Sequence, residues 1–208
     1  MERFLKPTNV IDSDHPTVRE KSGELIEGKE DVIEKAKSLF YFVRDEIKYN
    51  IYVSKSRPEY FKASRTLSRK EGYCVQKAVL LVALGRAAGI PAGLGFARLR
   101  NNLLPQKTVD WLGGNIIPFH GYAEFYLNGD WVKATPAFDL KLCQKNRFVP
   151  VEFDGRTDAM FPLHDQDERL HFEYIKDLGR HYDDLPLEKL FKALIKTAGP
   201  HALEPPPP

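Results

Sequence analysis

The hydrophobic positions follow a helical period in two segments of the first half of the chain. In residues 30–47 the apolar side chains recur three or four positions apart, which predicts an amphipathic helix. The segment CVQKAVLLVALGRAAGIP, which begins at Cys74, is apolar almost all the way round and predicts a buried central helix. Gly89 and the Ile-Pro that follows it are typical of a helix end. Residues 1–28 and 49–70 are polar and irregular, so we expect them on the surface.

Alternation with a period of two residues predicts a strand at residues 93–99 and a hairpin at residues 119–135. The turn of the hairpin is Asn128-Gly129, the pair that two-residue type I′ turns favour. Between these segments, residues 100–118 are expected to form a long loop of the kind that often serves as a lid.

Helical spacing returns at residues 168–178 and 187–197. Because the predicted strands follow one another without helices between them, we expect an α+β fold in which an antiparallel sheet packs on the central helix. The 208 residues suffice for one domain with a sizeable core, and we expect it to span residues 1–200. Residues 201–208 end in four prolines and are expected to be a tail outside the fold.

The overall charge gives no reason to expect a nucleic-acid or membrane partner. Charged residues make up 29% of the chain, the net charge is only +2, and no nucleic-acid-binding motif is present. Residues 48–70 are nevertheless basic and contain interleaved aromatic residues. This stretch fits a surface for nucleic acids or acidic substrates, or a solvated face, and we favour the solvated face.

The sequence favours a cytoplasmic protein. Its first residues, MERFLKPTNV, lack the apolar run of a signal peptide, and no stretch approaches the roughly 20 apolar residues of a membrane helix. The two cysteines, Cys74 and Cys143, are too few for a disulfide framework. We therefore expect free thiols in a reducing compartment.

Cys74 stands where the central helix is predicted to begin. Free backbone N–H groups and the helix dipole stabilise an anion there, so a thiolate at this position is expected to have a pKa below about 8.5. Gly72 allows the chain to turn sharply into the helix. The alternative is a small buried side chain that only fills space, and position alone leaves both interpretations open. For Cys143 the structural interpretation is the better one.

A thiol nucleophile needs a base that later acts as an acid, usually a histidine. Of the six histidines, only His120 lies on a confidently predicted strand. His164 and His171, with two nearby aspartates, fit no metal-binding spacing. We expect no metal and no other cofactor.

The hairpin register narrows the choice of a partner for His120. A two-residue turn places Glu124 opposite Lys133, a favourable cross-strand pair of charges. The same register makes Thr135 and Asp139 the diagonal neighbours of His120, roughly 7–8 Å away. Asp139 is the stronger orienting group because it is charged, but it requires strand geometry to persist past a proline. Thr135 requires no such extension but is neutral.

Together these motifs resemble the transglutaminase-like superfamily of papain-like thiol enzymes. The resemblance rests on GYCVQKAVLLVALGRAAGIP, FHGYAEFYLNGDWVK and ATPAFD, and it covers about residues 30–140. It is closest to small bacterial and archaeal members that are often described as cysteine proteases.

The resemblance implies that Cys74 is the nucleophile and His120 the general base and acid. The aspartate usual in the family falls at Thr135, so either Asp139 substitutes for it or Thr135 orients His120 weakly. The implied reaction is acyl transfer from a peptide or amide substrate through a thioester on Cys74, with the backbone N–H of Cys74 as an oxyanion donor. The acceptor is water in a peptidase or amidase and an amine in a transglutaminase. The alternative is a weak or inactive fold that serves as a binding or scaffolding module.

Overall fold

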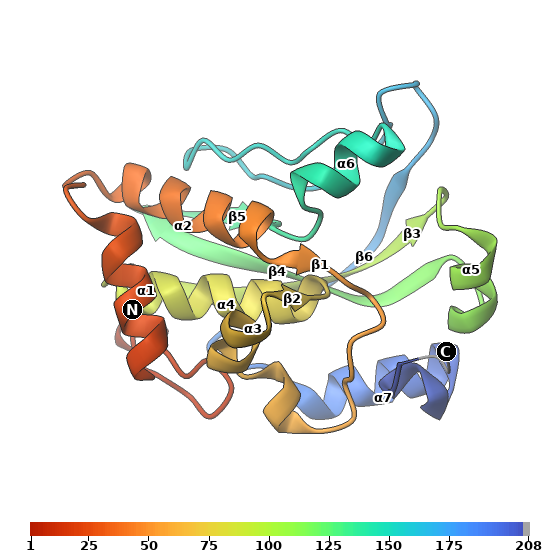
Figure 1. The fold of residues 1–208 in the computed structure, drawn as a ribbon, viewed down its shortest axis with the longest axis horizontal. Coiled ribbons are helices and arrows are strands. Elements are labelled where there is room, and N and C mark those ends of the chain that lie inside the picture. Colours follow the sequence, from red (N-terminus) through yellow and green to blue (C-terminus); the bar gives the residue numbers. More distant parts are fainter. Residues whose placement is uncertain (206–208) are drawn as a thin grey trace.

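The computed structural model describes residues 1–205, and its core is a four-stranded antiparallel sheet (Figure 1). In spatial order the strands are β5 (Asp130–Ala134), β4 (Ile116–Leu127), β3 (Ala92–Asn101) and β6 (Phe172–Tyr182). A parallel pair is formed by β1 (Lys48–Tyr49) and β2 (Glu71–Gly72). The helices are α1 (Pro16–Ile26), α2 (Val32–Glu46), α3 (Ala63–Arg69), α4 (Cys74–Ala87), α5 (Gln106–Leu112), α6 (Leu140–Asn146) and α7 (Leu187–Ala198), with short 3₁₀ turns η1 (Glu2–Phe4), η2 (Pro58–Phe61) and η3 (Pro200–Leu203).

Helix α4 is the centre of the fold, as its sequence predicts. It lies against β3 and β4, while α1, α2 and α3 pack around its other sides (Figure 1). Every residue of α4 from Cys74 to Arg86 is buried, because the segment is apolar on all faces. The helix ends at Ala87, and Gly89 just beyond it has a φ of 77°, the left-handed conformation that glycine favours after a helix. This arrangement of helices on an antiparallel sheet confirms the predicted α+β class.

The contact between α4 and the sheet depends on Gly85. A Cβ atom there would lie 2.4 Å from Cε1 of Phe125 in β4. We therefore expect Gly85→Ala to lower the free energy of unfolding by about 1–3 kcal/mol, despite the better helix propensity of alanine. Urea denaturation measures this change. Gly23→Ala is the matched control, because nothing lies within 4 Å of a Cβ at Gly23 in α1, and it should stabilise the protein by about 0.5–1 kcal/mol. Equal effects of the two substitutions would contradict this packing.

The predicted hairpin is present with the predicted register. Asn128 and Gly129 have φ values of 50° and 104°, as a type I′ turn requires, and Glu124 lies opposite Lys133. The prediction that these two side chains form an ion pair is wrong. Glu124 is fully buried and accepts hydrogen bonds from Nε of Arg180 (2.6 Å) and the backbone N–H of His181 (2.7 Å). The ammonium of Lys133 pairs instead with Asp158.

Three segments differ from their predicted structure. Residues 168–178 are not helical, because most of them belong to β6, which pairs with β3. Residues 100–118 are not one long loop, because α5 forms within them. Residues 1–28 contain α1, whose buried Val18 packs in the core. In each case the decisive contacts are with elements distant in the sequence.

The chain continues to pack against the domain beyond residue 200. The imidazole Nε2 of His201 lies 2.7 Å from the carbonyl oxygen of Trp111, and the carbonyl of Leu203 accepts a hydrogen bond from the backbone N–H of Lys55. Residues 201–205 of the expected tail are therefore part of the packed structure, whereas 206–208 lie outside the described residues.

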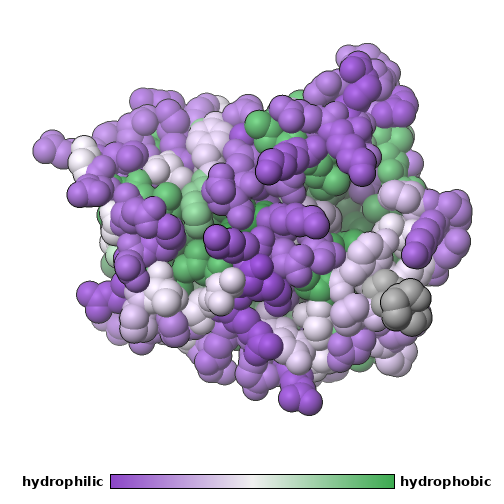
Figure 2. Space-filling view, viewed as in Figure 1, coloured by the Kyte–Doolittle hydropathy of each residue, from purple (hydrophilic) through white to green (hydrophobic). Residues whose placement is uncertain are grey.

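The surface in Figure 2 is mainly hydrophilic, and hydrophobic residues show mostly in hollows between charged side chains. Within residues 1–205, no helix combines the length and the apolar character that crossing a membrane would require.

Candidate active site

Two short strands set the start of α4 and therefore the position of Cys74. Tyr49 in β1 lies beside Gly72 in β2, which leads directly into the helix. A Cβ at Gly72 would lie 3.2 Å from side-chain carbons of Thr66 and Gln76, so a larger residue would crowd this turn. The backbone N–H at the N-cap position donates to the side chain of Gln76 (3.3 Å). These contacts hold the first turn of α4 at one end of the sheet.

His120 comes from the middle of β4, and the next residue brings that strand close to α4. A Cβ at Gly121 would lie 3.1 Å from Cα of Val75. Because glycine stands there, the backbone that follows Cys74 packs directly on the backbone that follows His120. Both side chains are buried, and both line one cavity of about 370 Å³. The structure thus brings the two main predicted residues to the same cavity.

Opposing effects act on the thiol of Cys74. Burial is the largest and raises the pKa of the thiol to about 11. Hydrogen bonds from the backbone N–H groups of Gly121, Val75 and Cys74 itself, and the nearby ammonium of Lys55, favour the thiolate but do not offset burial. The expectation of a pKa below that of a free thiol is therefore wrong for this state, because the helix start lies inside the core.

His120 is also neutral in this state. Burial lowers the pKa of its imidazole to about 3. The ring packs 5.1 Å from the ring of Phe161 and about 6.5 Å from those of Tyr122 and Tyr174. Within residues 1–205 its buried Nε2 atom has no hydrogen-bond partner. The two groups therefore rest as a thiol and a neutral imidazole.

Neither candidate orienting residue is hydrogen-bonded to His120. Pairing between β4 and β5 ends at Ala134, and the backbone N–H of Thr135 donates to Ala159 instead. The hydroxyl of Thr135 lies 3.3 Å from the sulfur of Met160. The strand geometry needed for Asp139 does not persist past the proline.

Asp139 has a different local role. It caps the N-terminus of α6, where Oδ1 accepts a hydrogen bond from the backbone N–H of Leu142 (2.9 Å). Its other oxygen, Oδ2, accepts from the backbone N–H of Tyr49 (2.8 Å). Since Tyr49 and Leu142 both line the thiol cavity, Asp139 fixes two parts of the cavity wall without contacting the imidazole.

Sequence reasoning missed the aromatic residues around His120. Tyr174 lies on β6, which the sequence pattern suggested was helical, and its hydroxyl accepts a hydrogen bond from the backbone N–H of Phe161 (3.2 Å). Phe161 belongs to an irregular segment without periodicity. The alternation of Phe172 and Tyr174 with charged residues was the one signal that could have indicated the strand.

The cavity at Cys74 and His120 is mainly apolar. Residues from the expected loop 100–118, including Leu103, Leu104 and Ile117, form one wall. Four phenylalanines also line the cavity: Phe138, Phe148, Phe161 and Phe172. Among residues 1–205, Lys48 is the only lysine, arginine, aspartate or glutamate that lines the cavity, and the predominance of apolar side chains suits an uncharged group of a ligand.

The other residues considered from the sequence form no second centre. His171 stacks on Phe172, with ring centroids 3.9 Å apart, and Asp165 pairs with Arg169. Cys143 is a buried residue of α6 and makes no disulfide. Within residues 1–205, no three histidine, cysteine, aspartate or glutamate side chains cluster as metal ligands would.

The raised pKa of Cys74 predicts a distinctive reactivity. The rate of alkylation by iodoacetamide, followed by peptide mass spectrometry, should rise about tenfold per pH unit from pH 7 to 10, because the thiolate fraction grows until the pH reaches the pKa of about 11. A free thiol such as glutathione should level off above its pKa of about 8.5. A plateau for Cys74 below pH 7 would instead indicate a thiolate–imidazolium pair and contradict this prediction.

Comparison with known families identifies the superfamily of the chain. The family model described as "Transglutaminase-like superfamily" matches residues 19–136, more than half of the chain. The chain therefore belongs to the transglutaminase-like superfamily. The matched region includes Cys74, His120 and Thr135 but ends before Asp139.

Several solved structures are similar to part of the chain. One is an inferred cysteine protease from Cytophaga hutchinsonii, with 22% identity and a TM-score of 0.49 over 64% of this chain and 40% of that one. Another is an inferred protease from Parabacteroides distasonis, with 13% identity and a TM-score of 0.43 over 64% and 24%. The periplasmic domain of TgpA from Pseudomonas aeruginosa has 18% identity and a TM-score of 0.45 over 64% and 45%. Less than half of each of those chains is covered. No curated protein gives a match.

Proposed function

We propose that this protein is a thiol-dependent acyl-transfer enzyme that acts on amide bonds of peptides or related compounds. One observation carries the proposal. Cys74 at the start of α4 and His120 on β4 line the same buried cavity, and backbone N–H groups are directed at the sulfur. A cysteine that only filled space would need neither a histidine in its cavity nor these N–H groups.

The neutral state of both groups suggests how the reaction begins. The sulfur of Cys74 attacks the carbonyl carbon of the amide while its proton passes to the imidazole of His120, so that ionisation and attack are coupled. The C–N bond then breaks, and the leaving amine takes the proton from the imidazolium. Water or a second amine attacks the resulting thioester, and His120 accepts and returns a proton again. The backbone N–H of Cys74 can stabilise the developing oxyanion.

We propose that packing, rather than a carboxylate, orients His120. The rings of Phe161, Tyr122 and Tyr174 surround the imidazole, and Thr135 stands where the family usually has its acid. Asp139 contributes indirectly by fixing Tyr49 and α6. A triad that loses its acid can lose orders of magnitude in rate, so we expect a slow enzyme. The proposed setting is the cytoplasm, where both thiols would stay reduced.

A binding or scaffolding module is the second candidate function. It is favoured by the buried Nε2 of His120, which has no hydrogen-bond partner within residues 1–205. Such a module would use the apolar cavity to hold an uncharged group without breaking a bond.

Incubation with a library of peptide coumarin amides, with and without methylamine, tests the proposal. Release of the coumarin with formation of an acid identifies water as the acceptor, and formation of an N-methyl amide identifies an amine. Either product must disappear with Cys74→Ala and persist with Cys143→Ser, which alters the other buried thiol. Tight binding of library members without any product would support the binding module instead.

A further inference from the structure

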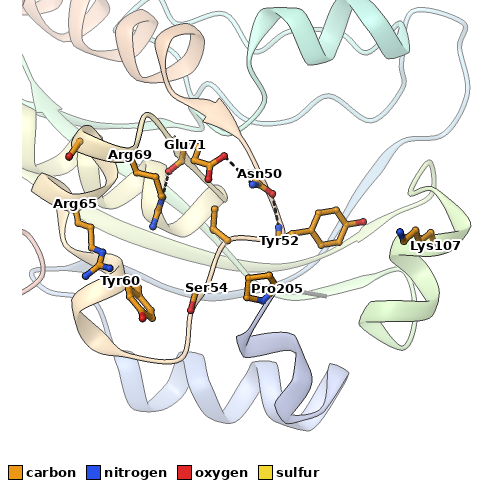
Figure 3. A pocket seen from close by; sticks show the side chains of 11 residues that line it. Asn50, Tyr52, Ser54, Tyr60, Arg65, Arg69, Glu71, Lys107 and Pro205 are labelled. Atoms are coloured by element: carbon orange, nitrogen blue, oxygen red, sulfur yellow. Dashed lines mark hydrogen bonds between the residues drawn. The ribbon is translucent and has the colours of Figure 1, made fainter. Parts of the chain in front are cut away.

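A second cavity, of about 900 Å³, lies beside the thiol cavity and is lined by basic side chains (Figure 3). Arg65 and Arg69 of α3 stand on one side of it, and Lys107 of α5 stands on the other. Asn50 and Tyr52 line both cavities, so the two spaces share one wall. The basic stretch of residues 48–70 therefore contributes to a concave surface next to the candidate active site, and is more than a solvated face.

The two arginines have unused capacity to bind an anion. Nε of Arg69 donates to the carbonyl oxygen of Glu71 (3.0 Å), but its Nη2 is buried and has no partner within residues 1–205. The exposed guanidinium of Arg65 lies 4.4 Å from the centre of the Tyr60 ring. A buried guanidinium nitrogen without a partner is costly, and an anion such as a carboxylate can satisfy it with a charge-assisted hydrogen bond.

The charges around the two arginines also favour an anion there. Burial lowers the pKa of Arg69, and the nearby positive charge of Arg65 adds to this effect while Glu71 opposes it. The ammonium of Lys55, which the charge of Arg69 also affects, is buried and held by the carbonyls of Ile51 and Val53. A bound anion would relieve the repulsion among these cations.

Two carboxylates lie near the basic side chains, and both already have partners: Glu71 lines the pocket, and Glu204 contacts the lining residue Ser54. Glu71 accepts a hydrogen bond from the side-chain amide of Asn50 (3.1 Å), and Glu204 accepts one from the hydroxyl of Ser54 (2.9 Å). They would repel an extended run of phosphates, which argues against a nucleic acid.

We propose that Arg65 and Arg69, with Lys107 on the facing wall, bind a carboxylate of the amide substrate whose uncharged acyl portion occupies the thiol cavity. The substrate class is thus an acidic peptide or another amide that carries a carboxylate near the bond to be cleaved. The claim that the anion belongs to an amide substrate rests on the proposed function. The anion pocket itself stands on the basic residues that line it.

Calorimetric titration of the Cys74→Ala protein tests binding separately from turnover. The probes are blocked alanine hexapeptides with one phenylalanine and with glutamate at each of the other positions in turn, each paired with its glutamine counterpart. At least one glutamate peptide should bind about tenfold more tightly than its counterpart, the range expected for a hydrogen bond to a charged group. Added salt should weaken that preference.

Substitutions locate the anion. The preference for glutamate should disappear with Arg65→Gln and with Arg69→Gln. Arg65→Gln is the safer variant, because Arg69 also holds the backbone of Glu71. Arg57→Gln is the matched control, since Arg57 is exposed in the same basic stretch but does not line the pocket, and it should retain the preference.

The outcomes separate the inference from the proposed function. If no glutamate peptide is preferred, or if the preference survives Arg65→Gln and Arg69→Gln, the anion pocket is wrong. If a single-stranded oligonucleotide binds more tightly than every peptide and needs the same arginines, the pocket serves nucleic acid and the peptide assignment is overturned. If glutamate peptides bind through the arginines but the wild-type protein never cleaves or transfers them, the proposed function fails while the anion pocket stands.

Discussion

Replacing Cys74 with serine is expected to slow cleavage of an amide substrate by at least about 1,000-fold, because a hydroxyl is a far weaker nucleophile than a thiol beside the same base. The substitution is nearly isosteric and leaves the N–H groups at the helix start in place. The fold should therefore survive, as circular dichroism and urea denaturation would show. The rate is measured with the coumarin amide that the wild-type protein cleaves best.

Cys143→Ser is the matched control for this experiment. Cys143 is equally buried, and burial also raises the pKa of its thiol to about 11, but it lies on α6 and does not line the thiol cavity. Its substitution should change the rate less than about threefold, provided that the fold is retained. Equal losses for the two variants would indicate a general structural effect and contradict the assignment of Cys74.

Replacing His120 with alanine is expected to reduce the rate about 100-fold, at the lower end of the range for a general base. The loss should be at this end because no carboxylate contacts the imidazole. Removal of the side chain opens space next to a cavity of about 370 Å³, so added imidazole should enter and restore part of the activity. The measurement is the rate of amide cleavage as a function of imidazole concentration.

His171→Ala tests whether this rescue is specific. His171 is also buried among aromatic rings, and burial likewise lowers the pKa of its imidazole, to about 4, but it does not line the thiol cavity. Added imidazole should not increase the rate of amide cleavage by the His171→Ala protein. Full activity of the His120→Ala protein would remove His120 from the mechanism.

Local patterns in the sequence were sufficient to predict the helix that begins at Cys74 and the hairpin that carries His120. The segment after Cys74 is apolar almost all the way round, which is typical of a helix buried on every side. The turn at Asn128-Gly129 fixes the hairpin that carries His120. Their approach depends on Gly121, whose role is visible only when β4 lies on α4. The sequence therefore predicted the elements that carry Cys74 and His120, and the fold explains how these two residues come to line one cavity.

Other features of the site depend on contacts that no local pattern encodes. Residues 172–182 form a strand because β3 offers an edge to pair with, and that pairing places Tyr174 near His120. The chain leaves the sheet after Ala134, so Thr135 and Asp139 hydrogen-bond to other groups instead of to the imidazole, as the hairpin register had suggested. The protonation states of the thiol and the imidazole follow from burial by several elements, and burial outweighs the helix start.

Rapid acid quenching during turnover, followed by intact-protein and peptide mass spectrometry, tests the central claim most directly. The proposed mechanism predicts an added mass equal to the acyl portion of the substrate, located on the peptide that contains Cys74 and removed by hydroxylamine, as expected for a thioester. The adduct should form more slowly in His120→Ala and not at all in Cys74→Ser. Substrate turnover without any acyl group on Cys74, or with the group on Cys143, would contradict the proposed role of Cys74.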